Sequence, residues 1–339
     1  MWKKFIAMTL AALTIVGCLT ACGGAENQPQ ETETTAQTEP AEEAKVLKVL
    51  TLGHSLAVDS GHMLALIANA EGYQEMKVGT LYYSGCPLSR HVKYLTENSP
   101  EYDLYISETT NAQQIPAIME KVTMQDALRL DYWDIIVMQD VPFGSAKSET
   151  FTNGDIQTIQ AYVNANKLNP NAVFAWHNPW ATPVDNDLRS SYPGESNPYF
   201  TRYAEYNDDR DALVNAINKC VGEHIMTDET FAFLIPSGAA MDNALSSYLT
   251  EKDLFRDYAH ATDLGRVIAS YTWFCALTGV EKLEEIKLDV IPKNFFRSTM
   301  GFEDRVLTDA EKQLILESVN NALANPLQVT QSQYTQAPA

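Results

Sequence analysis

Residues 45–55, KVLKVLTLGHS, give the clearest indication of the fold. This short run is rich in leucine and valine, and it closes on Gly53 followed by two polar residues. Such runs are typical of a strand buried on both faces of a sheet, and a glycine lets the chain turn sharply after it. We therefore predict a buried strand with a polar turn at its carboxyl end.

The same pattern recurs along the chain. Short apolar runs predict further strands, and between them apolar residues recur at helical spacing. The later strands are expected at 76–83, 135–138, 172–176 and 231–235, and the helices at 59–69, 123–130, 155–166, 208–221, 239–249 and 262–277. Continuous apolar strands that alternate with helices indicate a parallel sheet covered on both faces. The predicted fold class is α/β, with five parallel strands.

Polar or small residues follow four of the five predicted strands. In a parallel sheet, reactive groups gather beyond the carboxyl ends of the strands, so catalytic residues are expected at this edge. The four segments are Gly53-His54-Ser55, Ser84-Gly85-Cys86, Gln139-Asp140 and His177-Asn178.

Two of the polar segments carry residue types that can act together. Ser55 lies between a glycine turn and a helix, where its hydroxyl would face the sheet edge. The G-x-S-x-G elbow of the common esterase fold is absent, because Ala57 lies two residues later. Asp257 and His260 precede another helix in D-x-x-H spacing, which lets the aspartate orient an imidazole that accepts the proton of a serine. Taken singly, each feature is more often a turn or a helix cap.

In this order the segments resemble the sequence blocks of the SGNH (GDSL-like) hydrolases. Gly53-His54-Ser55-Leu56 is similar to the first block, Gly85 to the second and Met138-Gln139-Asp140 to the third. Asp257 and His260 match the last block. The resemblance implies a flavodoxin-like, three-layer α/β/α sandwich with a five-stranded parallel sheet.

The resemblance covers about residues 46–280, with two departures. His54 stands where the family mostly has Asp or Asn, and Gln139 stands where it usually has Asn. One less-studied branch of the family tolerates Gln there, and residues 235–239, IPSGA, also resemble that branch.

The resemblance also implies roles for these residues. His260 would remove the proton of Ser55, and Asp257 would orient the imidazole. The backbone amides of Ser55 and Gly85 and the side chain of Gln139 would bind the oxyanion. The reaction would pass through an acyl-serine, with no metal and no organic cofactor.

An aromatic segment follows the fourth predicted strand. Trp176, His177 and Trp180 lead into a long polar stretch that continues through Tyr192 and Tyr199. Long loops in compact domains are often functional, and aromatic rings there could stack on sugars. We interpret Trp176, His177 and Trp180 as a candidate substrate loop, with aromatic packing that ties down the loop as the alternative.

The first residues resemble the leader of a bacterial lipoprotein. Lys3 and Lys4 precede an apolar run too short to span a bilayer comfortably, and the segment 19–22, LTAC, is similar to a lipobox. We predict a signal peptide at 1–21, lipid attached to Cys22 and an extracytoplasmic location. An ordinary secretory peptide cut near Ala21 and an uncut anchor are the alternatives.

Composition divides the rest of the chain. Residues 22–44 contain almost no large apolar side chain and cannot offset their ordering entropy, so they are predicted to form a disordered tether. The folded domain is predicted at 45–327 and a disordered tail at 328–339.

The remaining cysteines and the charge limit the function. At most one disulfide can form among the three cysteines Cys86, Cys220 and Cys275. They share no short metal-ligand spacing and the histidines are scattered, so we predict no metal site. We predict that Cys275 is buried and packs as a small apolar side chain. A net charge of −20 argues against nucleic acid and against electrostatic attraction to anionic lipid.

These observations predict a lipid-anchored serine esterase that removes acyl groups, first of all acetyl, from a carbohydrate or a related small ester. The lipid would be its only membrane contact. A solute- or glycan-binding lipoprotein and a catalytically inactive SGNH relative are the alternatives.

Overall fold

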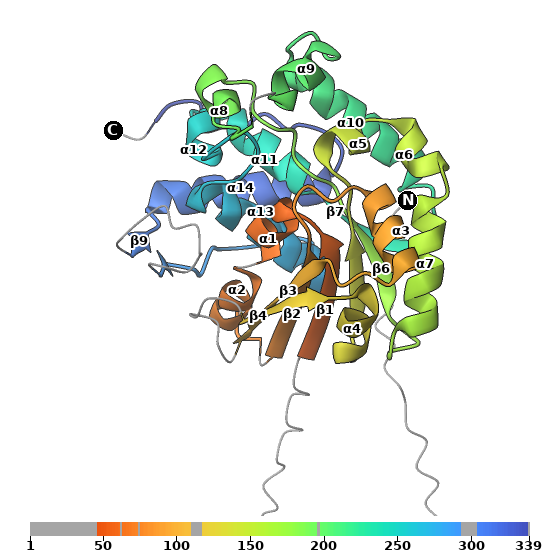
Figure 1. Ribbon diagram of the computed structural model, residues 1–339. Helices are drawn as coiled ribbons and strands as arrows, with labels where there is room; N and C mark the ends of the chain where they lie inside the picture. The colour runs from red at the N-terminus through yellow and green to blue at the C-terminus, as the bar shows by residue number, and fades with distance from the viewer. Residues whose placement is uncertain are drawn as a thin grey trace, which may run out of the picture. The chain divides into compact units, whose positions relative to one another are not determined.

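The computed structural model describes residues 46–61, 63–73, 75–109, 117–194, 197–292 and 304–337. Its centre is a seven-stranded sheet with the order β4-β3-β2-β1-β5-β6-β7 (Figure 1). The strands are β1 (Val46–Gly53), β2 (Glu75–Tyr82), β3 (Tyr102–Glu108), β4 (Ala117–Val122), β5 (Ile135–Met138), β6 (Val173–His177) and β7 (Phe231–Ile235). The predicted leader, Cys22 and the tether lie outside the described residues.

Five strands of this sheet are parallel, as the sequence predicts. β1 pairs in parallel with β2 and β5, and the parallel series continues through β6 and β7. β3 and β4 add an antiparallel extension at the β2 edge, which the sequence analysis missed. Both are partly exposed and interleave polar with apolar residues, so neither has the continuous apolar run of a buried parallel strand.

The parallel strands follow the flavodoxin-like order. In sequence order the five are β1, β2, β5, β6 and β7, and in space they run β2-β1-β5-β6-β7. The chain therefore reverses its direction of winding between β1 and β5, and ligands of such sheets bind beyond the strand ends at that point. Ser55 follows β1 and Gln139 follows β5, so both lie at this switch.

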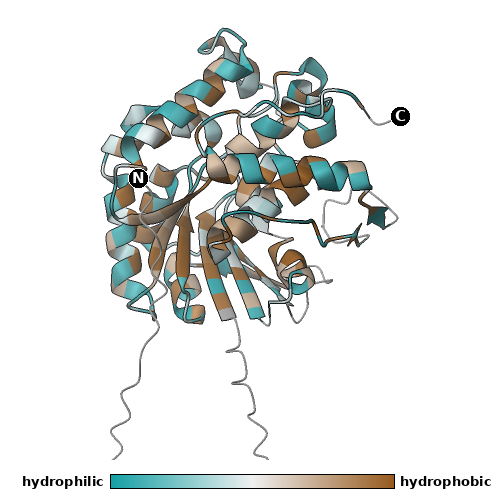
Figure 2. Ribbon diagram, turned by 180° about the vertical axis from the view of Figure 1, so that it is seen from behind, coloured by the Kyte–Doolittle hydropathy of each residue, from teal (hydrophilic) through white to brown (hydrophobic). Residues whose placement is uncertain are grey.

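Alternate residues of each strand face opposite layers of helices. In β1, Val49 joins one apolar cluster, and Leu50 and Leu52 join the other. The first cluster includes α1 (Ser55–Gly61), α2 (Leu64–Ala70), α11 (Ser237–Leu245), α13 (Asp263–Thr278) and α14 (Asp309–Ala324). The second includes α3 (Leu88–Glu97), α4 (Met124–Leu130), α7 (Asp155–Asn166) and α10 (Arg210–His224). Figure 2 shows the central strands largely hydrophobic and the helices carrying hydrophilic residues, which is the pattern of a three-layer sandwich.

Shorter elements complete the fold. These are α5 (Pro142–Ser145), α6 (Ser148–Thr152), α8 (Asn186–Ser190), α9 (Pro198–Ala204), α12 (Glu251–Leu254) and a two-stranded sheet of β8 (Val290–Ile291) and β9 (Arg305–Val306). Figure 1 shows α8 and α9 at the top of the view, beyond the carboxyl ends of the parallel strands. The segment between β6 and α10 therefore lies on the side of the sheet where the switch point is.

Two threonines cap helices that the sequence predicts. Thr123 accepts a hydrogen bond from the Asp126 amide and forms a capping box at the start of α4. Thr262 accepts one from the Gly265 amide at the start of α13. Each bond satisfies an amide that the first helical turn leaves without an intrahelical acceptor.

All three cysteines of the predicted domain are buried and free. Cys275 packs in the apolar cluster that contains α13, which confirms its interpretation as a small hydrophobe. In the part of the chain that the structure describes, no helix is both long enough and apolar enough to cross a bilayer.

The expectation of a disordered tail from residue 328 is wrong for residues 328–337, which lie along α11. The Thr330 amide donates to Asn243 Oδ1 at 2.7 Å, and the Ser332 amide donates to Ser246 Oγ at 2.9 Å. Polar composition led to the error, because a segment without large apolar side chains can still be held through its backbone when a helix presents polar partners.

We predict that Ser332→Ala lowers the free energy of unfolding by about 1–3 kcal/mol. The buried Ser332 hydroxyl donates to the Glu317 carboxylate and accepts the Tyr334 amide at 3.0 Å, so the variant leaves both groups without this partner. Urea denaturation measures the change. Gln331→Ala, at the exposed preceding residue, is the matched control and should change stability by less than about 0.5 kcal/mol. Equal stability of the two variants would contradict the docked tail.

Candidate active site

The turn after β1 sets the position of Ser55. A Cβ at Gly53 would lie 2.4 Å from Gln139 Nε2 and 2.9 Å from Ala57 Cβ, so only glycine fits here without displacement. Ser55 follows as the first residue of α1 and is half-buried. Amides in the first turn of a helix lack intrahelical acceptors, so the Ser55 amide can donate to a ligand.

Asp257 and His260 form the close pair that their spacing predicts. His260 Nδ1 lies 2.8 Å from Asp257 Oδ1 and 2.9 Å from Oδ2. The amides of Ala259 and His260 also donate to this carboxylate, each at 2.9 Å. Burial alone would raise the pKa of Asp257, but these hydrogen bonds and the charge of His260 hold it below its usual value. An ionised Asp257 favours the Nδ1–H tautomer, which leaves Nε2 free to accept a proton.

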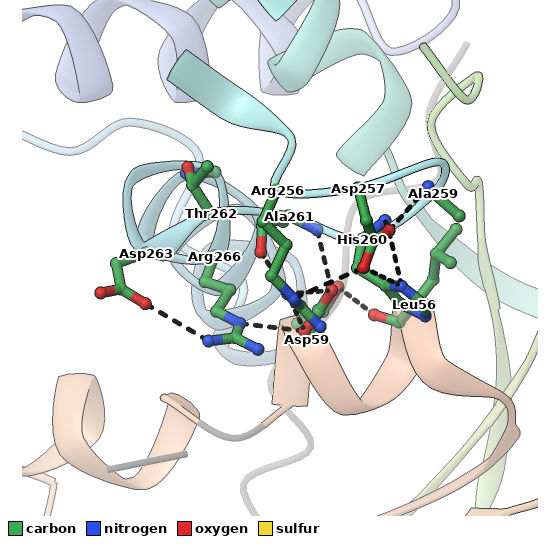
Figure 3. Close-up of polar contacts among 12 residues, drawn as sticks. Leu56, Asp59, Arg256, Asp257, Ala259, His260, Ala261, Thr262, Asp263 and Arg266 are labelled. Carbon is green, nitrogen blue, oxygen red and sulfur yellow. Dashed lines mark hydrogen bonds and ion pairs between the residues drawn. The ribbon is translucent and has the colours of Figure 1, made fainter. Parts of the chain in front are cut away.

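A buried carboxylate fastens the loop of this pair to α1 (Figure 3). Asp59 accepts from Arg266 Nε at 2.9 Å and from Arg256 Nη1 at 3.1 and 3.2 Å. It also accepts the Ala261 amide at 2.9 Å, and Arg256 Nη1 donates to the Ala261 carbonyl as well. Burial opposes the ionised form, but the two guanidinium groups lower the pKa of Asp59 to about 2. Asp59 is therefore an ionised anchor at neutral pH.

This anchor brings the predicted base to the helix of the predicted nucleophile. Asp59 lies four residues after Ser55, so the two occupy the same face of α1, one turn apart. Ala261, which Asp59 binds, directly follows His260. His260 also acts electrostatically on His54, which directly precedes Ser55, and on Asp59, which follows it by four residues. The structure thus brings the D-x-x-H loop to the first turn of α1.

His54 itself is buried behind this turn. Its Nδ1 accepts the Leu56 amide at 3.4 Å, so the imidazole supports the first turn of α1 from below. Burial, with a smaller contribution from His260, lowers the pKa of His54 to about 4. His54 is therefore neutral at physiological pH and supports the turn before Ser55.

The loop that contains Gly85 lies against the end of β1. Gly85 has φ = +55°, a conformation that favours glycine, and is exposed. The Tyr83 amide donates to the Gly53 carbonyl at 3.3 Å, and the Leu88 amide donates to Asp140 Oδ1 at 3.1 Å. These bonds tie one end of the loop to the last residue of β1 and the other end to Asp140, which directly follows Gln139. Among the described residues, the Gly85 amide has no acceptor.

Gln139 is fully buried and is oriented by His177. Its Oε1 lies 2.5 Å from His177 Nδ1. Burial holds the pKa of His177 well below its usual value, so the neutral imidazole donates Nδ1–H to this oxygen. The Gln139 Nε2 group then faces Gly53, without an acceptor among the described residues. It is a free donor directly beneath the turn before Ser55, although it is covered in this conformation.

The candidate substrate loop requires correction. Trp176, His177 and Trp180 are each fully buried, so none of the three rings is available to a sugar. Trp176 packs against the rings of Phe151 and Phe231 in the core, and His177 orients Gln139. β6 is buried to its last residue, and Trp180 beyond it is buried as well, so all three rings pack into the interior.

Trp180 supports the D-x-x-H loop instead. Its Nε1 donates to the Ala259 carbonyl at 3.0 Å, one residue before His260. The alternative interpretation, aromatic packing that ties down a loop, is therefore the correct one for this residue.

A cluster of tyrosines, two from the same long segment and one from the D-x-x-H loop, does lie beside the predicted base. The rings of Tyr192, Tyr199 and Tyr258 contact one another with centroids 4.8–5.6 Å apart, and Tyr258 lies 5.4 Å from the His260 ring. The Tyr258 amide donates to Ser191 Oγ at 3.0 Å, which joins the segment to the D-x-x-H loop. All three tyrosines are partly exposed, so they form an aromatic wall next to His260.

Sequence reasoning missed the residues that hold these parts together. Asp59 is far from Arg256 and Arg266 in the sequence. Of the three, only Arg256 adjoins a residue of the predicted site, because it directly precedes Asp257. The one available signal was a carboxylate four residues after Ser55 on a helix that is otherwise apolar on that side. In the described residues, no group of three or more His, Cys, Asp or Glu side chains is arranged to hold a metal ion.

Comparison with known proteins gives a family and a fold. The sequence model of a family described as a domain of unknown function, DUF4886, matches residues 48–292. The crystal structure of a DUF4886 family protein from Bacteroides uniformis is 22% identical and superposes with a TM-score of 0.69, over 86% of this chain and 100% of that chain. This likeness shows the fold. No curated protein matches the chain.

Two further solved structures are more distant. A protein from Slackia heliotrinireducens, provisionally described as an SGNH hydrolase, is 17% identical with a TM-score of 0.40, over 68% of this chain and 99% of that chain. A salicylyl-acyltransferase from a tetracycline biosynthetic pathway is 10% identical with a TM-score of 0.34, over 70% and 56% of the two chains. Both likenesses are too weak to carry an argument.

The Asp59 anchor predicts a pH-dependent stability difference. At neutral pH, Asp59→Asn should lower the free energy of unfolding by roughly 3–5 kcal/mol, because the buried Arg266 and the partly buried Arg256 lose the carboxylate that they share. The folded pKa lies below the unfolded value of 3.8, so the contribution of the carboxylate is present above about pH 4 and lost as the pH falls toward about 2. The difference between parent and variant should therefore narrow by about 2 kcal/mol over that interval.

Denaturation of both proteins at a series of pH values measures this difference. Glu120→Gln, which removes an exposed carboxylate, is the control and should differ from the parent by a small, nearly constant amount. A difference between parent and Asp59→Asn that stays constant down to about pH 2 would show that Asp59 is not the ionised anchor.

Proposed function

The chain belongs to the DUF4886 family, and we propose that it is an SGNH-type serine hydrolase that removes acyl groups, with acetyl first, from carbohydrate esters. One observation carries the proposal: the Asp257–His260 pair is fastened through Asp59 to the helix that begins at Ser55. The loop that carries the proposed base and its orienting carboxylate is thus bound directly to the helix whose first residue is Ser55.

The proposed reaction has two steps. His260 Nε2 takes the Ser55 hydroxyl proton as Oγ attacks the ester carbonyl, and the leaving alcohol receives that proton as its C–O bond breaks. Water then attacks the acyl-serine, giving its proton to His260, which returns it to Ser55 Oγ as the acid leaves. Asp257 stabilises the imidazolium in both steps.

Three donors are available for the oxyanion. The amides of Ser55 and Gly85 have no acceptor in the described residues, and Gln139 Nε2, whose amide His177 orients, lies against Gly53 without an acceptor there. The Gln139 amide must shift slightly before it can donate to the oxyanion. Its side chain is longer than that of asparagine, so it reaches under Gly53 and is covered. Losing one such donor costs about 3 kcal/mol of transition-state stabilisation.

The carbohydrate part of the proposal is supported by the aromatic wall. Tyr192, Tyr199 and Tyr258 stand beside His260 and are partly exposed, and aromatic rings bind the apolar faces of sugar rings while their hydroxyls accept or donate hydrogen bonds. The proposed location, outside the cytoplasm on a lipid anchor at Cys22, is supported by the lipobox-like segment of the sequence alone.

Replacement of the nucleophile tests the reaction. Ser55→Ala should lower kcat/KM for 4-nitrophenyl acetate roughly a thousandfold or more, because no other group can form the acyl-enzyme. Ser99→Ala, a serine at the end of α3, is the matched control and should keep the parent activity. A fluorophosphonate should label the parent and the control but not Ser55→Ala.

The same experiment separates the alternatives. Equal hydrolysis by the parent and Ser55→Ala would reject the proposed triad. A parent that neither hydrolyses the ester nor reacts with the fluorophosphonate would instead identify an inactive relative of the SGNH hydrolases, with His54 and Gln139 as the departures that disable it.

The aromatic wall gives a second prediction. Tyr258→Ala should raise KM several-fold for an acetylated xylo-oligosaccharide with a smaller effect on kcat, because the ring would contact the sugar and not the reacting carbonyl. Tyr258→Phe, which keeps the ring, should restore KM. If Tyr258→Phe is as defective as Tyr258→Ala, the ring does not act by stacking on the sugar.

A further inference from the structure

We propose that a hollow beside the Gly85 loop is a subsite for a negatively charged group on the substrate's sugar. The inference deepens the proposed function and rests on it for the identity of the substrate. The hollow has a volume of about 350 Å³ and is lined by Tyr83, Pro87, Ser89, Arg90, Lys93 and Tyr94. That volume is at the lower end of the range of ligand sites and admits one ring with its substituent.

Two cations on one face of α3 give the hollow its charge. Arg90 and Lys93 are three residues apart, so both project from the same side of the helix. Both are exposed, and within the described ranges neither forms an ion pair with a carboxylate. The whole chain has 44 acidic and 24 basic residues, so these two neighbouring cations give the hollow a local charge opposite in sign to the net charge of the chain.

Tyrosines form the wall of the hollow. The rings of Tyr83 and Tyr94 meet edge to face with centroids 5.2 Å apart, and the Arg90 guanidinium lies over the Tyr83 ring at 5.3 Å. The stacked arginine loses little further side-chain freedom when it binds, and its planar group can hold a carboxylate or sulfate through two parallel hydrogen bonds. A flat ring surface beside a held guanidinium suits a sugar ring with an acidic substituent.

The hollow adjoins the proposed reaction centre. Tyr83 and Pro87 line it, and Gly85, the proposed oxyanion donor, lies between them in the chain. The Tyr83 amide also donates to the Gly53 carbonyl, two residues before Ser55. An ester carbonyl bound at Gly85 would therefore leave the next part of the substrate at Arg90 and Lys93. The aromatic wall at Tyr258 lies with His260 and is a separate group of residues.

These contacts select the ligand chemistry. Nothing in the lining is acidic, so an anionic group meets no opposing carboxylate there. One anionic substituent on a sugar matches two cations and two rings, and a uronate carboxylate and a sugar sulfate share this chemistry. We infer that the preferred substrate is an acylated acidic glycan, rather than an acylated neutral one.

Competing substrates test the subsite. The two substrates are O-acetylated glucuronoxylan oligosaccharides that carry the uronate and the same acetylated oligosaccharides without it. In the parent, kcat/KM for the first divided by kcat/KM for the second should exceed one. Arg90→Gln and Lys93→Gln should each lower this ratio several-fold, and the double variant should bring it close to one. Lys219→Gln, which removes an exposed cation on α10, is the matched control and should leave the ratio unchanged.

Salt should also lower this ratio of kcat/KM values, because it screens the electrostatic attraction between an exposed subsite and an anionic substrate. Raising the ionic strength should lower the ratio in the parent and change it little in the double variant. A ratio equal in the parent, Arg90→Gln and Lys93→Gln would overturn the proposal.

Direct binding separates this result from a failure of the proposed function. Saturation-transfer NMR with D-glucuronate, D-glucose 6-sulfate and D-glucose needs no hydrolysis. The parent and Lys219→Gln should show stronger transfer to the two anions than to glucose, and the double variant should lose this difference; the relative transfer to the two anions distinguishes a carboxylate from a sulfate ligand. Equal transfer to all three sugars in the parent would overturn the subsite even if the triad hydrolyses esters.

Discussion

The arrangement of the candidate site depends on one buried carboxylate, Asp59. Its oxygens are bound by Arg266, Arg256 and the Ala261 amide, and its side chain has almost no exposed surface. A buried ion pair of this kind adds little net stability, because desolvation of the charges offsets their attraction. It does define geometry, since any other placement of the D-x-x-H loop would leave buried charges without partners.

That constraint connects distant parts of the chain. Asp59 and Arg266 are separated by 207 residues, yet both face the same side of the sheet through α1 and α13. The parallel order of β1 and β5 places the turn before Ser55 over Gln139, and the Gly85 loop is tied to both strands. The proposed nucleophile, base and oxyanion donors are therefore each positioned by a different element around one switch point.

The elements with strong periodicity were predictable. The strands at 135–138 and 231–235 and the helix at 155–166 have the bounds that the sequence predicts, because their apolar patterns are uninterrupted. The antiparallel strands, the docked tail and the burial of Trp176 were not predictable in this way. Each depends on what neighbouring elements offer, and a polar segment that finds partners looks in sequence like one that does not.

The α/β class, the five parallel strands and the D-x-x-H pair could be predicted from the sequence, because they follow from local periodicity and from contacts over three residues. Which polar residues meet is known from the folded structure alone. In the folded protein His177 orients Gln139 and does not belong to a substrate loop, and Asp59 binds the loop that contains His260. Burial and pairing of charged groups depend on the whole packed interior, so no local pattern can specify them.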